Sequence, residues 1–389
     1  MTPLRKEDAE MSARPADTMR AAVWTGDGPT LQIEDIQVPR PEQGEVLVKV
    51  ISCGVCHTDL HVMKGEVAFP SPAVLGHEIS GTVVELGPGT EPVRGVDVGA
   101  KVVGAFIMPC GQCKQCQRGR DDMCLPFFAQ NRLKGALYDG TTRLHRTDGT
   151  PLAMYSMAGL AEYSVVPINA LAPLHGDIPD VAAAILGCAF FTAYGAVHQT
   201  AALQAGETVA VVATGGVGSS IVQLARAAGA ETIIAVDISD EKLSAAKQLG
   251  AHHVVNSSTT DAVAAVRELT GGAGVDVAFE VLGRRQTFEQ AIKMLSDGGR
   301  MVAVGIAAGK STAEVEITPL VRRGLKVMGS FGGRTRQDLP AVIDLAATGV
   351  FSVEDTVTRT YPLDAAGEAF EALARGEIQG RAVIDMSSS

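Results

Sequence analysis

Residues 207–237 have the sequence ETVAVVATGGVGSSIVQLARAAGAETIIAVD, and this stretch decides the fold. A compact apolar run (207–213) leads through a glycine-rich turn into a segment with helical periodicity (219–230), and a second apolar run (232–237) follows. Compact apolar runs are typical of buried strands, whereas an apolar period near 3.6 residues indicates a helix. The stretch therefore predicts two parallel strands joined by a crossover helix.

Strand and helix patterns go on alternating after this stretch, at 241–250, 252–256, 261–272, 275–283, 287–299 and 300–306. Such alternation predicts an α/β fold with a doubly wound parallel sheet, the Rossmann type. Before about residue 190 the pattern differs. Short apolar runs such as 46–54 and 79–89 stop at glycine, which is typical of an irregular, strand-rich domain.

The chain has 389 residues, enough for two domains of typical size. We expect a Rossmann domain at 190–331 and a discontinuous strand-rich domain at 19–189 and 332–389. Residues 1–18 are polar and lack an apolar core segment. They predict a disordered tail without a signal peptide, and hence a cytoplasmic protein.

Charge and hydrophobicity exclude two classes of partner. The net charge is −11, whereas nucleic-acid binding needs a basic surface. The uncharged segment 181–206 is long enough to span a membrane, but it contains Gly187, Thr192, His198 and Gln199. We therefore expect a buried core segment and no membrane contact.

A short segment, 110–124, contains Cys110, Cys113, Cys116 and Cys124. In a chain without a secretory signal, clustered cysteines are metal ligands more often than disulfides. Four thiolates fill the tetrahedral coordination of zinc and leave no position for a substrate, which predicts a structural zinc. An iron–sulfur cluster also takes four thiolates, but its usual spacings differ. Unrelated cysteines are the remaining alternative.

Three other residues, Cys56, His77 and Cys188, have the composition of an open zinc site. Two sulfurs and one imidazole leave the fourth tetrahedral position for water or an alcohol, as in catalytic zinc sites. Each of them taken singly is compatible with an ordinary core position, Cys188 above all because it lies in an apolar run. Only the combination favours a metal.

The turn after the first Rossmann strand is suited to a pyrophosphate, because backbone amides at a helix N-terminus attract phosphate. Its residues are Gly215, Gly216, Val217 and Gly218. Asp237 ends the next strand about 20 residues later, where a carboxylate binds ribose hydroxyls and repels a 2′-phosphate, so we expect NAD rather than NADP. Ala213 replaces the first glycine of the pattern. Its methyl group is tolerated if the turn needs no positive φ there.

Several segments together resemble the zinc-dependent medium-chain alcohol dehydrogenases: CHTDLH (56–61), GHEISG (76–81), the four-cysteine segment and GCAFFTAYGA (187–196). The resemblance runs from about residue 19 to the C-terminus. It implies a GroES-like catalytic domain beside the Rossmann domain. It also implies a catalytic zinc bound by Cys56, His77 and Cys188, and a structural zinc bound by the four cysteines.

The same resemblance implies further site residues. Asp59 orients His77, Glu78 lies behind the metal, Thr58 contacts the substrate oxygen and His61 ends a proton relay. Additional cofactor contacts are implied for His57, Thr192, Lys242, Val281, Arg284, Val304 and Arg381. An apolar substrate pocket is implied for Val67, Phe106, Phe128, Met154 and Tyr155.

Dehydrogenases of this kind interconvert alcohols and aldehydes or ketones by hydride transfer to and from NAD. The apolar pocket favours primary alcohols with a hydrophobic or aromatic body. The alternatives are a mycothiol- or glutathione-type formaldehyde dehydrogenase, a nicotinoprotein that keeps its NAD, and a non-enzymatic zinc-bearing binding protein. The chain length resembles the long-chain branch of the family, which implies a homodimer, with a tetramer as the alternative.

Overall fold

The computed structural model describes residues 16–90, 95–307 and 309–388. The alternating segments of the second half form one six-stranded sheet in the order β13-β12-β11-β14-β15-β16, in which every neighbouring pair is parallel. This order confirms the doubly wound fold. The strands are β11 (Thr208–Val212), β12 (Thr232–Asp237), β13 (His253–Asn256), β14 (Val275–Glu280), β15 (Leu295–Ala303) and β16 (Lys326–Gly329).

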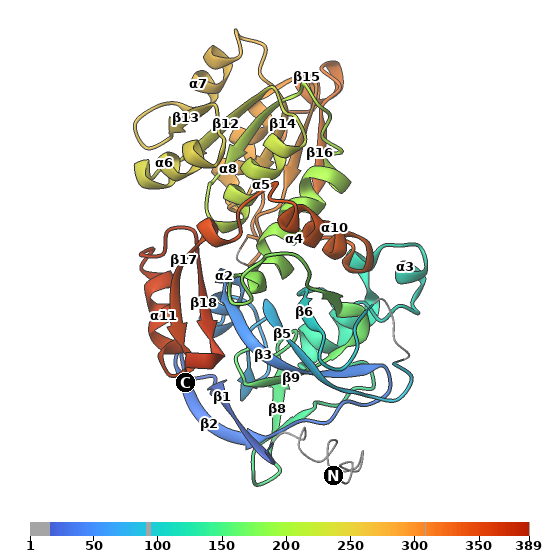
Figure 1. Cartoon of the computed structure of the whole chain (residues 1–389). Coiled ribbons are helices and arrows are strands. Elements are labelled where there is room, and N and C mark those ends of the chain that lie inside the picture. The colour runs from blue at the N-terminus through green and yellow to red at the C-terminus, as the bar shows by residue number, and fades with distance from the viewer. Residues whose placement is uncertain (1–15, 91–94, 308, 389) are drawn as a thin grey trace.

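Helices connect these strands, as Figure 1 shows in its upper part. They are α5 (Gly216–Ala227), α6 (Asp240–Leu249), α7 (Ala262–Leu269), α8 (Arg285–Lys293) and α9 (Ile317–Arg322). Several predicted boundaries differ from the observed ones, and the largest difference concerns the helix before β15. The helix expected over 287–299 ends at Lys293, because Leu295 already pairs with Val275 of the neighbouring strand.

Alternate residues of β11 pack on opposite faces of this sheet. Val209 and Val211 belong to the core that continues into the first half of the chain, whereas Ala210 and Val212 belong to a second core on the other face. A parallel sheet that is covered on both faces produces this arrangement, and it explains why the strand is an unbroken apolar run.

The first half of the chain forms a strand-rich, GroES-like domain, confirming the predicted second fold. One sheet has the order β2-β1-β4-β8-β7, and the other has the order β10-β6-β5-β3-β18-β17, with β9 also paired to β3. The strands are β1 (Thr18–Trp24), β2 (Leu31–Gln37), β3 (Glu45–Val55), β4 (Ala73–Val74), β5 (Ile79–Leu86), β6 (Lys101–Gly104), β7 (Leu144–His145), β8 (Pro151–Met154), β9 (Tyr163–Pro167) and β10 (Leu171–Pro173).

The C-terminal segment lies against this strand-rich part. It contains α10 (Thr335–Ala347), β17 (Val357–Pro362), α11 (Ala366–Ala374) and β18 (Arg381–Asp385). Strand β18 pairs antiparallel with β3, so that Ala382 lies opposite Val55, and this register brings Arg381 beside the start of α2 (His57–Met63). The domain boundaries at 189/190 and 331/332 stay a prediction.

The uncharged segment forms a nearly continuous helical path from Ala182 to Thr200, with α4 (Ala189–Tyr194) in its middle. By length and composition this helix could span a membrane, but 78% of its most apolar window is buried inside the molecule. Helix α4 packs on both α5 and α10, between the two sheet systems in Figure 1. The predicted tail falls mostly on residues 1–15, which lie outside the described residues, and Thr18 already belongs to β1.

Candidate active site

The four clustered cysteines form a compact thiol group. Their sulfur atoms all lie within 4.8 Å of one another, on a loop that contains α3 (Lys114–Gln117). Backbone amides point at the sulfurs, since Cys110 N donates to Cys124 Sγ at 3.2 Å and Cys113 N donates to Cys110 Sγ at 3.3 Å. Burial raises the pKa of Cys124 to about 11, so this thiol would not ionise at neutral pH without a cation. The group has the donor chemistry of a closed zinc site.

An ion pair fixes this loop to the rest of the molecule. Arg336 of α10 bonds the carboxylate of Asp121 at 2.6 Å and donates to the carbonyl oxygen of Cys116 at 2.6 Å. Asp121 is 1% exposed, so its charge depends on this arginine. The loop is therefore attached to the helix that also packs on α4.

The second group contains the three predicted residues and one more. Ligand atoms of Cys56, His77, Glu78 and Cys188 all lie within 4.8 Å of one another. The hydrogen bond between the two thiols lowers the pKa of Cys56 and raises that of Cys188. Two sulfurs and an imidazole in this arrangement fit a divalent cation with an open position.

The orientation of His77 supports this fit. Its Nδ1 lies 2.9 Å from Oδ2 of Asp59, and Asp59 Oδ1 accepts a hydrogen bond from Gly76 N at 3.0 Å. Burial lowers the pKa of His77, but Asp59 and Cys56 outweigh burial and raise it to about 10. Within the described part of the chain, the buried Nε2 has no hydrogen-bond partner, and a metal would bind there in place of the Nε2 proton.

Glu78 connects the metal group to the nucleotide turn. Burial raises the pKa of Glu78 to about 7, although its ion pair with Arg381 opposes that change. Arg381 is 5% exposed and its side chain lies against the turn, because a Cβ on Gly216 would be 2.7 Å from Arg381 Cδ. Glu78 is thus a fourth potential ligand, where the sequence led us to expect only a residue behind the metal.

The proposed relay residues lie on the first turns of α2. Thr58 Oγ1 is 3.6 Å from Cys56 Sγ. The ring of His61 is half exposed and its Nδ1 forms an ion pair with Glu66, a partner that the sequence did not reveal. The ring centroid of His57 is 6.4 Å from that of His61, and burial lowers the pKa of His57.

The glycine-rich turn corrects one expectation. Ala213 has φ +73°, so the turn does require the left-handed conformation at the position where alanine replaces glycine. Such a conformation costs an L-residue about 1–2 kcal/mol. The turn also needs Gly218, because a Cβ there would lie 2.0 Å from the carbonyl oxygen of Ala213. Among the residues that the structure describes, nothing lies within 4 Å of a Cβ on Gly215, which leaves space above the helix N-terminus.

The carboxylate of Asp237 accepts hydrogen bonds from backbone amides of two segments at the expected nucleotide site. Its Oδ2 accepts from Thr214 N at 2.8 Å, and its Oδ1 accepts from Ile238 N at 2.8 Å and from Ser239 N at 3.2 Å. The acid is therefore oriented before any ribose binds. Lys242 follows on the first turn of α6, where its backbone N donates to the Ser239 side chain.

The remaining expected cofactor residues vary in exposure. Thr192 is buried on α4 beside Cys188, whose carbonyl oxygen accepts from Thr192 N at 2.7 Å. Val217, Val281 and Val304 are partly buried, whereas Arg284 is exposed at the start of α8.

Aromatic side chains surround the face of His77. Phe106 lies 6.0 Å from the His77 ring and Tyr155 lies 6.3 Å from it, both edge-on. Phe331, which the sequence did not single out, contacts Phe106 at 5.5 Å and Phe128 at 5.6 Å between ring centroids. The apolar pocket expected from the sequence is thus partly assembled here.

Two expected pocket residues lie elsewhere or at the margin. The Sδ atom of Met154 accepts from Arg143 N at 3.3 Å, on the side of β7. The ring of its neighbour Tyr155, by contrast, lies 6.3 Å from the ring of His77. Val67 lines a separate cavity of about 480 Å³ with Trp24, Met63 and Phe69.

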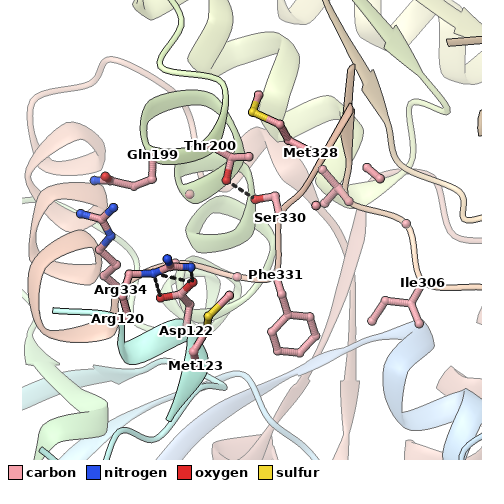
Figure 2. A pocket seen from close by; sticks show the side chains of 17 residues that line it. Arg120, Asp122, Met123, Gln199, Thr200, Ile306, Met328, Ser330, Phe331 and Arg334 are labelled. Atoms are coloured by element: carbon pink, nitrogen blue, oxygen red, sulfur yellow. Dashed lines mark hydrogen bonds and ion pairs between the residues drawn. The ribbon is translucent and has the colours of Figure 1, made fainter. Parts of the chain in front are cut away.

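A larger cavity of about 670 Å³ lies beside the aromatic group (Figure 2). It is lined by Val304, Phe331 and the Thr200–Ser330 pair, whose hydroxyl oxygens are 3.0 Å apart. On its other side Arg120 bonds Asp122 at 2.7 Å. Because Phe331 belongs to both the cavity wall and the aromatic group, the cavity adjoins the expected substrate pocket.

Both halves of the chain match known protein families. Residues 42–180 match the alcohol dehydrogenase GroES-like domain, and residues 216–348 match the zinc-binding dehydrogenase family. The chain belongs to the zinc-dependent medium-chain alcohol dehydrogenases. It is 37% identical to the probable S-(hydroxymethyl)glutathione dehydrogenase 1 of Schizosaccharomyces pombe, over 95% of this chain and 97% of that protein. It is 36% identical to the S-(hydroxymethyl)glutathione dehydrogenase of Synechocystis, over 92% and 97% respectively.

Solved structures of dehydrogenases share the whole fold. The benzyl alcohol dehydrogenase of Acinetobacter calcoaceticus superposes with a TM-score of 0.88 at 32% identity, covering 95% of this chain and 99% of that one. The acetophenone reductase of Geotrichum candidum, solved in complex with NAD, superposes with a TM-score of 0.77 at 28% identity, covering 96% and 98%. These likenesses confirm the predicted two-domain α/β class.

Proposed function

We propose that this zinc-dependent oxidoreductase uses NAD to oxidise a primary hydroxyl group, and that Cys56, His77 and Cys188 hold its catalytic zinc. The observation that carries the proposal is the convergence of their ligand atoms within 4.8 Å. Arg381 strengthens it, since this side chain contacts both Glu78 of the metal group and the nucleotide turn. The NAD complex of a structural relative supports the choice of cofactor.

The side chains around the proposed zinc site have different roles in the reaction. A zinc ion bound there would supply Lewis acidity that lowers the pKa of the substrate hydroxyl, and NAD would supply the hydride acceptor. Asp59 keeps Nδ1 of His77 occupied, so that Nε2 faces the metal group. The hydroxyl group of Thr58 can accept a hydrogen bond from the substrate hydroxyl and relay a proton by giving up its own, and the half-exposed His61 can release a proton to solvent.

For the substrate we favour the hydroxymethyl adduct of formaldehyde with a low-molecular-weight thiol. The names of the curated relatives support this alternative better than our first expectation of hydrophobic alcohols. An aromatic alcohol is the second candidate, because Phe106, Phe331 and Phe128 form an aromatic wall and a structural relative is a benzyl alcohol dehydrogenase.

A substrate panel separates the two candidates. Formation of NADH would be followed with formaldehyde alone, with formaldehyde plus glutathione or mycothiol, and with benzyl alcohol. We expect formaldehyde to be oxidised only when a thiol is added. The thiol adduct would be refuted as the substrate if formaldehyde were oxidised equally fast with and without thiol. It would also be refuted if benzyl alcohol were oxidised and formaldehyde with thiol were not. Release of nicotinamide nucleotide on denaturing the purified protein would identify a nicotinoprotein.

We also propose a homodimer formed through β16, with a tetramer as the alternative. This strand is an edge of the six-stranded sheet, and it exposes Val327. The helix before it, α9, exposes Ile317 at 76% and Val321 at 72%. An unpaired strand edge beside exposed apolar side chains favours pairing with a second copy. The cytoplasmic location stays a prediction.

A further inference from the structure

Two buried donor groups near the metal group have no hydrogen-bond partner within the described part of the chain. They are Nη1 of Arg132 and the hydroxyl group of Tyr155. The guanidinium carbon of Arg132 lies 4.2 Å from the centroid of the Tyr155 ring, so the two side chains are in contact. Leaving such groups unpaired is unfavourable, and more so for a charged group.

Arg132 differs in this from the other inward-facing arginines. Arg143 pairs with Glu45, Arg336 pairs with Asp121, and Arg381 pairs with Glu78. For Arg132, no carboxylate within 4 Å is found among residues 16–90, 95–307 and 309–388. Apart from solvent, which reaches this partly buried side chain, the face of the Tyr155 ring is the group that the described residues place against its positive charge. A partly buried guanidinium whose Nη1 is buried without a partner, and which has no carboxylate near it among the described residues, is suited to an anion that a ligand supplies.

The fold holds this pair in a fixed position. Asn131, the residue before Arg132, donates to the carbonyl oxygens of Met154 and Ser156 at 3.2 Å each. Its Oδ1 accepts from Ser156 N at 2.9 Å. These hydrogen bonds attach the residues on both sides of Tyr155 to the residue before Arg132. The backbone therefore helps to hold the side chains of Arg132 and Tyr155 next to each other.

The pair also stands close to the reacting centre. The Tyr155 ring lies 6.3 Å from the ring of His77, and the guanidinium lies on the face of that tyrosine. Phe69 packs edge-on against Tyr155 at 4.9 Å, so the nearby wall is apolar. A substrate whose hydroxyl reaches the metal group could place its distal end at the two donors.

We propose that Arg132 and Tyr155 bind a carboxylate at the end of the substrate opposite to the reacting hydroxyl. The guanidinium fork suits a carboxylate, and the phenol would supply another donor. This proposal rests on the proposed function and narrows it to carboxylate-bearing hydroxymethyl compounds. Such a group could come from the thiol of an adduct or from an aromatic acid.

The test compares matched charged and neutral substrates of the zinc-loaded enzyme. One pair is para-(hydroxymethyl)benzoate and its methyl ester. The other is formaldehyde with glutathione or with glutathione diethyl ester. Arg132→Met should lower kcat/KM for the charged member of the preferred pair by about 10- to 100-fold, as expected for a charged hydrogen bond. The rate with the neutral member should change less than about threefold.

Three further variants make the outcome decisive. Arg132→Lys should recover part of the loss, and Tyr155→Phe should show a smaller loss of about three- to tenfold. Lys134→Met removes an exposed positive charge from the same segment and should leave both rates unchanged. Equal losses on charged and neutral substrates, or no loss on either, would overturn the proposal while leaving the proposed function intact.

If turnover is too slow to measure, the affinity for the carboxylate can be measured directly. Calorimetric titration of para-(hydroxymethyl)benzoate into the zinc-loaded protein should give a Kd about 10- to 100-fold weaker for Arg132→Met than for the wild type. An unchanged Kd would show that water alone occupies the two donors. If the carboxylate binds but no substrate of either pair is oxidised, the proposed function fails and the binding site stands.

Discussion

Replacing Ala213 with glycine should leave the cofactor domain as stable as the wild type or more stable. Ala213 has φ +73°, a conformation that costs an L-residue about 1–2 kcal/mol and glycine almost nothing. Glycine also gives the unfolded chain more freedom, which costs about 0.4–1 kcal/mol. The difference predicts a gain of roughly 0–1.5 kcal/mol in the free energy of unfolding.

Two matched glycine variants serve as controls in urea denaturation followed by circular dichroism. Ala202→Gly relieves a second positive φ, +48°, at an exposed position outside the nucleotide turn, and it should behave like Ala213→Gly. Ala245→Gly, at an exposed position inside α6, should lose about 0.5–1 kcal/mol. A loss of that size in Ala213→Gly would refute the reasoning from backbone strain.

The same variant tests whether the turn is already formed before NAD binds. Because the strain of Ala213 is present in the free protein, its relief should change the Kd for NAD by less than about threefold, within about 0.7 kcal/mol. Titration of NAD into the zinc-loaded variant measures this. A tenfold change would mean that the methyl group acts on the cofactor itself.

Three further predictions concern other parts of the molecule. Asp237→Asn should raise the ratio of kcat/KM for NADP to that for NAD by about tenfold or more, measured by steady-state kinetics, because a negative charge no longer opposes a 2′-phosphate. Arg336→Met should lower the free energy of unfolding by roughly 2–3 kcal/mol in urea denaturation, since it leaves the buried Asp121 unpaired. Val327→Lys should shift the protein toward monomer in analytical ultracentrifugation, whereas an unchanged mass would exclude the β16 edge as the interface.

The features that the sequence predicted well are those with a local or repeated signal. Strand–helix alternation identified the Rossmann sheet, because each unit of the pattern forms within about twenty residues. The four-cysteine segment was equally clear, since its ligands lie on one loop. Cys56, His77 and Cys188 are far apart in the chain, and only the family resemblance connected them before the fold was known.

Features that depend on direction or on distant contacts were missed. Met154 and Tyr155 are adjacent in sequence, yet the Met154 sulfur lies beside the backbone of Arg143 while the Tyr155 ring lies near His77, and no composition rule reveals this difference. Phe331 joins the aromatic wall across a distance of more than two hundred positions from Phe106. The positive φ of Ala213 was also hidden, because alanine carries no signal for that conformation.

The central claim is that Cys56, His77 and Cys188 form the catalytic metal site, and Cys188→Ala tests it most directly. Zinc content and NADH formation would be measured together for the wild type, for Cys188→Ala and for Cys53→Ala, a buried cysteine outside both metal groups. We predict that Cys188→Ala retains the zinc of the four-cysteine loop, loses the second zinc and shows no turnover, while Cys53→Ala retains both. Full zinc content with near-normal turnover in Cys188→Ala would contradict the account.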